Sequence, residues 1–283
     1  MNPSKVRLSA RIESFRYPDG TVALAGTELD ILDGQFCGIL GSNGSGKTTL
    51  LKLLDGMIKD FTGSVTLDGD DVRRLSPKEI YGKVGLVFQN PDDQLFAHSV
   101  YEDVAFGPRN MGLKEQEVAR RVSEALESVE IADLAKKDIH NLSYGQKKRA
   151  CIAGLLAMGH EILLLDEPTA GLDPMGEYKM MELLTRLNRE GGVTIVMATH
   201  SVDLVPVFLN RLHILSRGVL VRSGTPEEVF DSHDDLASVK LRLPYIAELI
   251  HKLKHDDALP FKRVPLTVGE ARREILEAFA SRN

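Results

Sequence analysis

Short apolar runs recur along the chain, each bounded by polar residues or glycine. Four of them carry the pattern most clearly: "QFCGIL" (35–40), "KVGLVFQN" (83–90), "EILLLDE" (161–167) and "VTIVMATH" (193–200). Runs of this length that are rich in Val, Ile and Leu predict buried strands. They alternate with stretches of helical periodicity at 47–57 and 113–137. Strands that alternate with helices predict an α/β fold with a largely parallel sheet and helices around it.

Turn signals predict further strands at both ends of this region. The first 40 residues alternate short apolar strands with turns, and "YPDG" (17–20) is such a turn. The segment "GSVTLDGDDV" (63–72) predicts a strand, a turn and the edge of a second strand. The segment "RLHILSRGVLVRSG" (211–224) predicts a terminal hairpin with Arg217 and Gly218 at its turn.

The pattern changes after residue 224, where helix starts and an apolar helical face predict a small helical appendage. Thr225 and Glu228 form a capping box, with Pro226 at the first helical position. Thr267 and Glu270 repeat this arrangement. The apolar positions of the face are Leu243, Ile246, Ile250 and Leu253. This face either packs on the main domain or forms a dimer contact, and the pattern leaves both open.

The composition narrows the class of protein. The chain has 283 residues and a net charge of −6, so a basic nucleic-acid footprint is not visible globally. Its N-terminus has no apolar signal core, and no window reaches the roughly 20 apolar residues that a membrane-spanning helix needs. Cys37 and Cys151 lie in apolar runs, which favours small buried side chains in a reducing compartment. We therefore expect a soluble protein whose membrane role would come through a partner.

The segment "GSNGSGKT" (41–48) fits the pattern G-x-x-x-x-G-K-[ST] in full, after a predicted strand and before a predicted helix. Its glycines let the backbone N–H groups curl toward a phosphate, and the helix start adds positive potential. Lys47 is placed for the β- and γ-phosphates of a nucleotide, Thr48 offers a hydroxyl to Mg²⁺, and Thr49 is a second hydroxyl nearby. The expected nucleotide-binding residues here are Gly41, Ser42, Asn43, Gly44, Ser45, Gly46, Lys47, Thr48 and Thr49.

Polar residues end three of the predicted strands. Asp166 and Glu167 follow "ILLL", and adjacent strand residues point to opposite faces, so we expect Asp166 to bind Mg²⁺ and Glu167 to polarise an attacking water. His200 and Gln89 end two other strands, and the carboxyl ends of parallel strands share one sheet edge. His200 is therefore a candidate contact to the γ-phosphate, and the Gln89 amide can reach metal or water. Tyr17 is either a core aromatic or a ring that stacks on a base.

A second segment, "NLSYGQKKRA" (141–150), also has the composition of a phosphate site. A small hydroxyl residue, a ring and a glycine precede a basic and then apolar helical pattern. One chain therefore carries two segments suited to phosphate, far apart in the sequence.

Together these segments resemble the ATP-binding cassette (ABC) ATPases over about residues 7–224. Six motifs stand in the family's order: Walker A "GSNGSGKT", Gln89 of the Q-loop, the signature "LSYGQ", Walker B "ILLLDE", the D-loop "GLDP" and the switch His200. The resemblance implies a P-loop NTPase fold of the ABC type, with a RecA-like mixed sheet core, an antiparallel β subdomain and an α-helical signature subdomain at about 90–160. With the tail, we expect a domain of 1–224 and a C-terminal helical extension of 225–283.

The resemblance also implies roles that the pattern alone leaves open. It implies that Tyr17 stacks on adenine, that Glu167 is the catalytic base, and that His200 senses the γ-phosphate. It implies that Asp173 of the D-loop spans a dimer interface. The expected catalytic residues are Lys47, Gln89, Glu167 and His200, and the expected residues near Mg²⁺ are Thr48, Gln89 and Asp166.

In this family two chains pack head to tail, so that each ATP lies between one chain's Walker A segment and the other's signature. The resemblance implies that Ser143, Gly145 and Gln146, at a helix start, bind the γ-phosphate of the partner's ATP. Two residues depart from the family pattern. Tyr144 replaces the glycine usual at the second signature position, and Ser201 follows the switch histidine where an acidic residue is common. Because the other signature residues are kept, we expect phosphate binding to survive; Ser201 bears on local geometry only.

The segment between Gln89 and the signature, together with "LSYGQKKRACIAGLLAM" (142–158) and "LRLP" in the tail, resembles the energy-coupling-factor (ECF) transporter ATPases, most closely the cobalt-uptake type. This implies ATP hydrolysis coupled to import of cobalt or nickel ions, at the cytoplasmic face of the cell membrane. It implies a membrane-embedded coupling protein and a substrate-binding membrane protein as partners, and no nucleic acid. Phe96, Val100 and Phe106 are apolar in a polar segment, and they either pack in the core or form a groove for a partner's helix.

Three alternatives remain: a vitamin-importing ECF transporter, a soluble ABC ATPase acting on ribosomes or DNA, and a non-hydrolysing regulator. Translation-type members carry two cassettes, and DNA-repair types insert a long coiled coil before the signature. This chain has one copy of each motif and no sustained heptad run. Intact Glu167 and His200 argue against the regulator. The pair is either a homodimer or a heterodimer with a related ATPase, and a homodimer is favoured because every motif for two active sites is intact.

Overall fold

A mixed sheet forms the centre of the protein, whose computed structural model describes residues 5–231, 233–259, 261 and 263–280. Its strands are β3 (Phe36–Leu40), β6 (Val84–Val87), β7 (Ile162–Asp166), β8 (Thr194–Thr199), β9 (Arg211–Ser216) and β10 (Val219–Gly224). They lie in the order β10-β9-β3-β8-β7-β6, and every neighbouring pair is parallel except β9 and β10. The predicted parallel strands and the terminal hairpin are thus confirmed.

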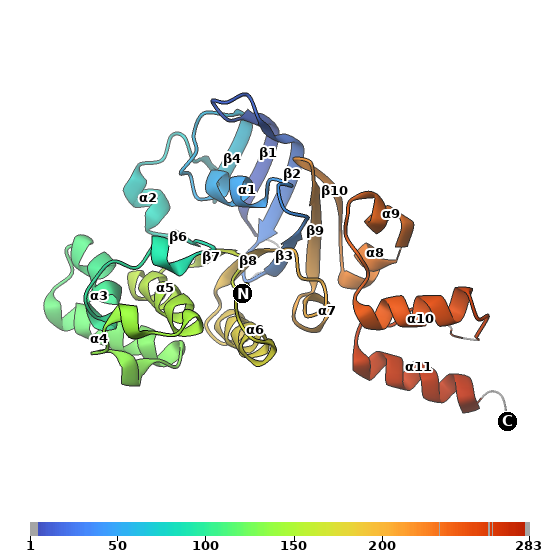
Figure 1. Cartoon of the computed structure of the whole chain (residues 1–283). Coiled ribbons are helices and arrows are strands. Elements are labelled where there is room, and N and C mark those ends of the chain that lie inside the picture. Colours follow the sequence, from blue (N-terminus) through green and yellow to red (C-terminus); the bar gives the residue numbers. More distant parts are fainter. Residues whose placement is uncertain (1–4, 232, 260, 262, 281–283) are drawn as a thin grey trace.

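A second, antiparallel sheet lies beside the first (Figure 1). Its strands are β1 (Val6–Arg16), β2 (Val22–Leu32), β4 (Thr62–Leu67) and β5 (Asp70–Asp71), in the order β2-β1-β4-β5. The predicted turn at 17–20 joins β1 to β2, and the Gly20 N–H donates to the Tyr17 carbonyl at 2.9 Å. The antiparallel β subdomain that the resemblance implied is therefore present.

Helices cover the central sheet and form a separate group at one side (Figure 1). Before the C-terminal segment they are α1 (Lys47–Leu54), α2 (Pro77–Tyr81), α3 (Val100–Asn110), α4 (Glu115–Ser128), α5 (Tyr144–Met158), α6 (Pro174–Arg189) and α7 (Val205–Phe208), with short 3₁₀ turns η1 (Pro91–Asp93), η2 (Ala132–Leu134) and η3 (Ile139–Asn141). The helices α3, α4 and α5 pack against one another and form the predicted helical subdomain.

One predicted helix is shorter than its sequence pattern. The periodicity at 113–137 predicts a single helix, whereas α4 ends at Ser128 and 3₁₀ turns follow. Glu130 has a φ of 60°, in the left-handed region, which a right-handed helix does not accommodate. The apolar spacing continues past this point because the turns still face the same core.

Alternate residues of the central strands enter two different cores. In β7, Ile162 and Leu164 pack into the core shared with α1 and the antiparallel sheet, whereas Leu163 and Leu165 pack into the core under α3 to α6. All four side chains are fully buried. Burial of each such side chain contributes about 1.5–3 kcal/mol. Both faces of the sheet are covered, so the polar residues at its carboxyl edge are the ones left to meet a ligand.

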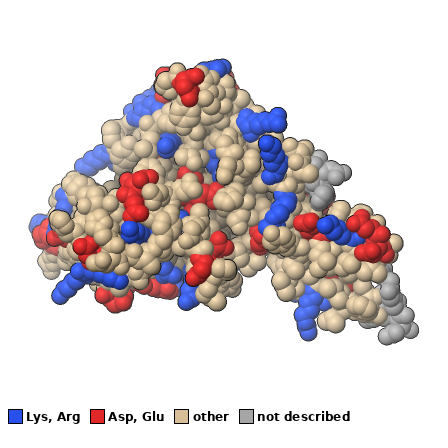
Figure 2. Space-filling model, viewed as in Figure 1, with Lys and Arg blue, Asp and Glu red and all other residues tan. Residues whose placement is uncertain are grey.

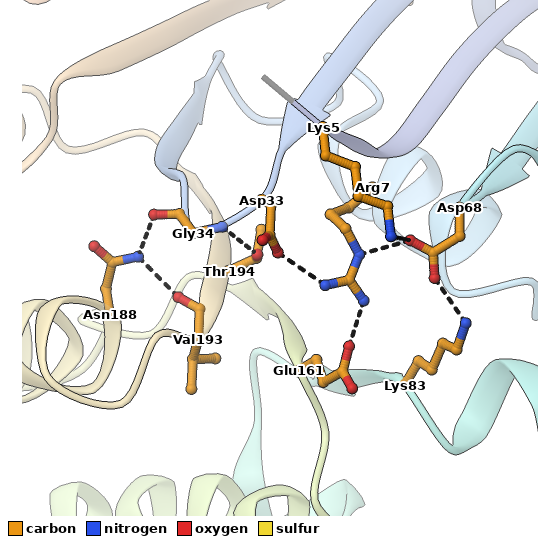
Figure 3. A network of polar contacts seen from close by, with 10 residues as sticks. All are labelled: Lys5, Arg7, Asp33, Gly34, Asp68, Lys83, Glu161, Asn188, Val193 and Thr194. Atoms are coloured by element: carbon orange, nitrogen blue, oxygen red, sulfur yellow. Dashed lines mark hydrogen bonds and ion pairs between the residues drawn. The ribbon is translucent and has the colours of Figure 1, made fainter. Parts of the chain in front are cut away.

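Arg7 on β1 ties the antiparallel sheet to the central one (Figure 3). Its buried guanidinium donates to Asp68 at 2.7 Å, to Asp33 at 2.8 Å and to Glu161 at 2.5 Å. Asp68 also accepts from Lys83, just before β6, at 2.7 Å. Hydrogen bonds between ionised groups are about twice as strong as neutral ones. This network fixes the two sheets against each other at the edge opposite the carboxyl ends of the strands.

The C-terminal segment begins in the main core and ends outside it. Its helices are α8 (Pro226–Phe230), α9 (His233–Ser238), α10 (Tyr245–His255) and α11 (Val268–Ala280). Both predicted capping contacts are present: the Glu228 and Glu270 N–H groups donate to the hydroxyls of Thr225 and Thr267 at 3.3 Å. Residues 229, 230 and 243 lie in the main core, so that core continues past the predicted boundary at 225. The boundary between two domains stays a prediction.

The predicted apolar face in the tail is divided between two cores. Leu243 is buried in the main core, whereas Ile250 packs with Phe261 and Ala271 in a small cluster between α10 and α11. Ile246 and Leu253 are partly buried against that cluster. Packing on the main domain, the first of the two possibilities, therefore holds for Leu243, whereas the other three residues pack within the C-terminal segment itself.

Basic and acidic side chains are interspersed over the face of the described residues in Figure 2. This mixture agrees with the modest net charge of −6. Throughout the described part of the chain, each helix is too short or too polar to cross a bilayer.

Candidate nucleotide site

The loop at 41–46 joins β3 to α1 and has a backbone that side chains would obstruct. A Cβ at Gly41 would lie 2.4 Å from the Ser45 hydroxyl, and one at Gly46 would lie 2.5 Å from the Ala23 carbonyl oxygen. Gly44 and Gly46 have φ values of 77° and 105°, which glycine adopts without strain. No side chain caps α1 at Gly46. The first N–H groups of this helix are therefore available to an anion.

Lys47 is the first residue of α1 and is buried. Its ammonium group donates to the Gly41 carbonyl at 2.8 Å and to the Ser42 carbonyl at 3.3 Å. It also lies 3.6 Å from Oε1 of Glu167. The loop thus folds around the ammonium group, which is the arrangement that places a positive charge at the centre of a phosphate cradle.

Thr48 and Asp166 meet across the sheet edge. The Thr48 hydroxyl donates to Oδ2 of Asp166 at 2.7 Å. Oδ1 of Asp166 is buried and has no hydrogen-bond partner among the described residues. Burial raises the pKa of this carboxyl group, and the Thr48 hydrogen bond opposes the rise. A hydroxyl beside an unpartnered carboxylate oxygen is a donor set that suits Mg²⁺, so these residues fit the expected metal.

Glu167 lies between two other predicted catalytic residues. Its Oε1 is 2.8 Å from Nδ1 of His200, which follows β8, and 3.6 Å from Nζ of Lys47. A carboxylate only accepts hydrogen bonds, so Nδ1 of His200 carries a proton in this contact. The Glu167 side chain is buried, whereas that of His200 is 55% exposed.

The direction of Glu167 has a different cause from the one we expected. Strand alternation would set it only if Glu167 continued β7, but that strand ends at Asp166. Glu167 has a φ of 50°, a left-handed conformation. Its own N–H still donates to the Ala198 carbonyl of β8 at 2.9 Å. The two carboxylates separate because the backbone turns after Asp166, not because strand residues alternate.

A cavity of about 370 Å³ brings most of the predicted site residues together. Its lining consists of Tyr17, Thr21, Val22, Ala23, Asn43, Gly44, Ser45, Gly46, Lys47, Thr48, Thr49, Gln89, Asp166 and Glu167. Gln89 reaches it from the segment after β6, and His200 borders it through its contact with Glu167. Gly41 and Ser42 contribute through the carbonyl groups that hold Lys47.

Tyr17 and Thr49 form one unit at this cavity. Their hydroxyls lie 2.9 Å apart and share a hydrogen bond. The Tyr17 ring packs edge-on against Phe15, with centroids 4.9 Å apart. The Thr49 side chain is buried, so its hydroxyl reaches the cavity mainly as the partner that fixes Tyr17. Tyr17 was expected to be either a core aromatic or a ring that stacks on a base. Both interpretations remain open, because the ring packs on a core residue and also lines the cavity.

The predicted signature residues lie elsewhere, at the start of α5. Ser143 caps this helix: its hydroxyl accepts from the Gln146 N–H at 3.3 Å, while the Gln146 side chain accepts from the Ser143 N–H at 3.0 Å. Ser143 is exposed, and Gly145 and Gln146 are half-buried. The lining of the nucleotide cavity contains none of these three described residues. Within one chain the two phosphate-type segments are therefore separate.

Tyr144, the unusual signature residue, connects α5 to the segments that contain Gln89 and Gly171. Its hydroxyl donates to the Gln89 carbonyl at 3.2 Å. Its ring packs on Gly171, where a Cβ would lie only 2.9 Å from the ring. The Tyr144 ring therefore fits against the backbone at position 171 because a glycine there has no side chain. The nearby Asp173 caps α6 through the Gly176 N–H at 2.6 Å, which gives it a local role besides the predicted dimer contact.

Lys148 is a site residue that sequence reasoning missed. It lies on α5, its side chain is 1% exposed, and its ammonium group donates to the Glu167 carbonyl at 2.6 Å. In the sequence it is one of three consecutive basic residues, which is typical of a solvated helix surface. The sequence signal that could have identified Lys148 is its helical spacing relative to the apolar residues of α5. Lys148 lies on the same side of α5 as Cys151, Ile152 and Leu155, which are buried too.

The segment after Gln89 supplies both exposed and core residues. Phe96 and Phe106 are exposed and pack edge to face, with centroids 4.7 Å apart, whereas Val100 is fully buried. Phe106 also lines a groove of about 540 Å³ with Lys78, Tyr81, Gly82, Gly107, Asn110, Met111 and Met158. Val100 is therefore a core residue, and the two phenylalanines are free to meet a partner.

Known proteins are similar to this chain in sequence and in fold. The family model described as ABC transporter matches residues 24–170, just over half of the chain. The chain belongs to the ABC transporter family. It is 71% identical to an ABC transporter ATP-binding protein of Geobacter sulfurreducens, over 96% of this chain and 98% of that protein. It is 47% identical to the energy-coupling factor transporter ATP-binding protein EcfA of Methanococcus maripaludis, over 95% and 97% of the two chains.

Solved ABC structures confirm the fold. The structure of cbiO1 from Clostridium perfringens, part of the ABC transporter complex cbiONQ, aligns with 88% of this chain and all of its own, at a TM-score of 0.76 and 42% identity. The ATP-binding cassette MJ0796, solved as a dimer in a post-hydrolysis state with ADP and Pi, aligns with 77% of this chain and 98% of its own, at a TM-score of 0.68 and 29% identity. This chain is thus an ATP-binding subunit of the ABC type with ECF-type relatives.

Proposed function

We propose that this chain hydrolyses ATP as the motor subunit of an ECF importer for cobalt or nickel ions. The observation that carries the proposal is the position of Glu167, whose carboxylate lies 2.8 Å from His200 and 3.6 Å from Lys47 at the carboxyl edge of the sheet. A carboxylate there can take a proton from a water that attacks the γ-phosphate. A regulator that only binds nucleotide would not need this triad.

Each residue of the triad has a task that its surroundings support. Lys47 exchanges its carbonyl partners for phosphate oxygens and holds the β- and γ-phosphates. Glu167 orients and deprotonates the attacking water, and the proton on Nδ1 of His200 fixes the carboxylate in place. Thr48 and Asp166 would hold Mg²⁺, which when bound neutralises charge on the phosphate oxygens. Gln89 lines the same cavity, from which its amide would reach the metal or the water.

Two chains are needed for a complete site. Ser143, Gly145 and Gln146 do not line the cavity of their own chain, and α5 packs with α3 and α4 apart from α1 (Figure 1). A head-to-tail pair places each signature against the ATP held by the other chain. The dimer of MJ0796 supports this arrangement, as does the intact set of motifs in this chain. ATP binding would close the pair and hydrolysis would reopen it.

The membrane partners would dock on the helical subdomain. The groove beside Phe106 is mostly apolar and lies next to α2 and α3, and Phe96 extends the exposed apolar surface. An amphipathic helix of a membrane-embedded coupling protein is the occupant we propose, which places the chain at the cytoplasmic face of the cell membrane. The likeness to cbiO1, part of an ABC complex, supports the coupling partner. An ECF importer of vitamins is the alternative.

Replacing the proposed base tests hydrolysis directly. Glu167→Gln keeps the size and hydrogen-bonding reach of the side chain and removes its basicity, so we expect ATP hydrolysis to fall by roughly a hundredfold or more. Nucleotide affinity should stay within about threefold. Glu182→Gln on α6 is the matched control, because Glu182 is exposed. Equal turnover by Glu167→Gln and wild type, measured as phosphate release from the purified chain, would contradict the proposed function.

The transported substrate needs a separate experiment. The chain would be purified from membranes with its partners, reconstituted in vesicles, and assayed for ATP-dependent uptake of Co²⁺, Ni²⁺ and vitamins. We expect Co²⁺ or Ni²⁺ uptake. Uptake of a vitamin alone would be compatible with the proposed role as the ATP-hydrolysing subunit, but it would show that the substrate is a vitamin rather than a metal ion.

A further inference from the structure

The buried Lys148 links the start of the signature helix to the backbone of Glu167. Lys148 lies on α5, little more than one helical turn after Ser143, which caps the same helix. Its ammonium group donates to the Glu167 carbonyl at 2.6 Å inside the protein. Lysine is almost never fully buried without a specific partner. The partner here is the main chain of the proposed catalytic base.

The conformation of Glu167 shows why such a contact matters. A non-glycine residue in the left-handed region is strained, so neighbouring contacts must hold it there. The Glu167 N–H is held by the Ala198 carbonyl of β8 at 2.9 Å. The Glu167 carbonyl accepts from Lys148 at 2.6 Å and from the Ala170 N–H at 3.1 Å. The carboxylate is therefore aimed by contacts from β8 on one side and from α5 on the other.

The surroundings of Lys148 indicate a role other than stability. Burial lowers the pKa of its ammonium group to about 8, so charge at this position costs folding free energy. An apolar residue of similar length would avoid that cost. The Tyr144 ring lies 5.3 Å from the ammonium group and contacts the segments of Gln89 and Gly171. The first turns of α5 thus contact the segments of Gln89 and Glu167, which line the cavity, and the segment of Gly171.

We propose that Lys148 is a positioning residue that makes the aim of the Glu167 carboxylate depend on the position of the signature helix. This proposal rests on the composite sites proposed above. Ser143 at the start of α5 faces the ATP held by the partner, while Lys148 on the same helix holds the base that acts on the chain's own ATP. Occupancy of one site is thereby transmitted to the catalytic base of the other through a single helix.

Two variants separate the positioning role from a structural one. Lys148→Met keeps an unbranched side chain of similar length and removes the donor, and Lys148→Gln keeps a neutral donor. For Lys148→Met we expect the turnover number to fall about tenfold or more, with nucleotide affinity within about threefold and Tm within a few degrees of wild type. The Hill coefficient for ATP should fall toward one, because the two sites lose their link. Lys148→Gln should recover a large part of the turnover.

The measurements use the full chain, with phosphate release, a fluorescent ATP analogue and thermal unfolding as readouts. Lys136→Met is the matched control, since Lys136 is an exposed lysine of the helical subdomain, and it should behave as wild type. Wild-type turnover and cooperativity in Lys148→Met would overturn the proposal. Parallel losses of turnover, affinity and Tm that Lys148→Gln does not relieve would also overturn it. If Lys148→Met does not fold, a Lys148→Gln protein whose turnover, nucleotide affinity and Tm all fall together would overturn the proposal, because such losses indicate a structural role alone.

The failure of this proposal can be told from failure of the proposed function. An inactive Glu167→Gln together with a fully active Lys148→Met leaves hydrolysis by Glu167 intact and removes only the link through α5. Full activity of Glu167→Gln removes the function on which the link depends.

Discussion

The two helices that begin at phosphate-type segments differ at their starts. The helix α1 follows Gly46, which has a φ of 105° and no side-chain cap, so its first N–H groups are open to a ligand. The helix α5 follows Ser143, and a complete capping box with Gln146 occupies its start. An anion therefore gains more at α1 than at α5. In the proposed function, the chain would hold a nucleotide at α1 alone, whereas α5 would add contacts to a phosphate held by another chain.

The ends of the same two helices also differ. The helix α5 ends at Gly159 in the left-handed conformation, a common way to stop a helix. The helix α1 ends at Asp55, a buried carboxyl group at the end where the helix dipole disfavours negative charge. The helix that carries the phosphate loop is thus open at its start and electrostatically unfavourable at its end, and both features can be tested.

The largest effect is expected at the open helix start. Lys47→Ala removes the charge at the centre of the loop, so we expect ATP-dependent uptake to be abolished and nucleotide affinity to fall by at least tenfold. The fold should remain, because the contacts of the ammonium group with described residues are to two carbonyl groups and to Glu167 at the cavity. Uptake in vesicles and thermal unfolding measure the two parts, with Lys136→Ala as the control. Undiminished uptake by Lys47→Ala would contradict the role of α1.

The open start of α1 was predictable from sequence, and the reasons are local. The glycine pattern before Lys47 consists of residues that are close together in the sequence, and so does the apolar run around Leu164. Strand-end residues such as Asp166 follow from the topology of a parallel sheet, which places them at one edge. Such features can be predicted without knowing which residues distant in the sequence are in contact in the folded chain.

The connections of α5 were not predictable in the same way. The contact of Tyr144 with Gly171 and the hydrogen bond from Lys148 to Glu167 join residues whose proximity depends on tertiary packing. The left-handed conformation at position 167 is adopted by a glutamate rather than by a glycine, so the sequence does not indicate it. Glu130 likewise ends α4 early without a helix-breaking residue, so the length of that helix was overestimated.

The next effect tests the capped start of α5. Ser143→Ala removes a cap worth about 1 kcal/mol and the hydroxyl proposed to meet the partner's ATP. We expect turnover to fall roughly tenfold while the affinity of a single chain for nucleotide stays unchanged. Ser99→Ala is the matched control, because Ser99 caps α3 in the same way, with its hydroxyl accepting from the Glu102 N–H at 3.3 Å. Equal turnover by the two variants would show that only capping is lost.

The smallest effect concerns the end of α1 and appears in stability rather than turnover. Burial raises the pKa of Asp55 to about 7, whereas an unfolded aspartate titrates near 3.8. Between these values the folded chain keeps a proton that the unfolded chain loses. The stability from this group is therefore complete below pH 3.8 and is lost as the pH rises through 7.

Asp55→Asn removes this titration. We expect the variant and wild type to unfold alike near pH 4, and the variant to gain on the order of 1–3 kcal/mol over wild type at pH 8. Denaturant unfolding at pH 4.5, 6 and 8 measures the difference. Asp231→Asn is the control, since Asp231 is exposed at the end of α8 and its replacement should give no such trend. A stability difference between Asp55→Asn and wild type that does not grow with pH would show that the buried carboxyl group does not destabilise α1.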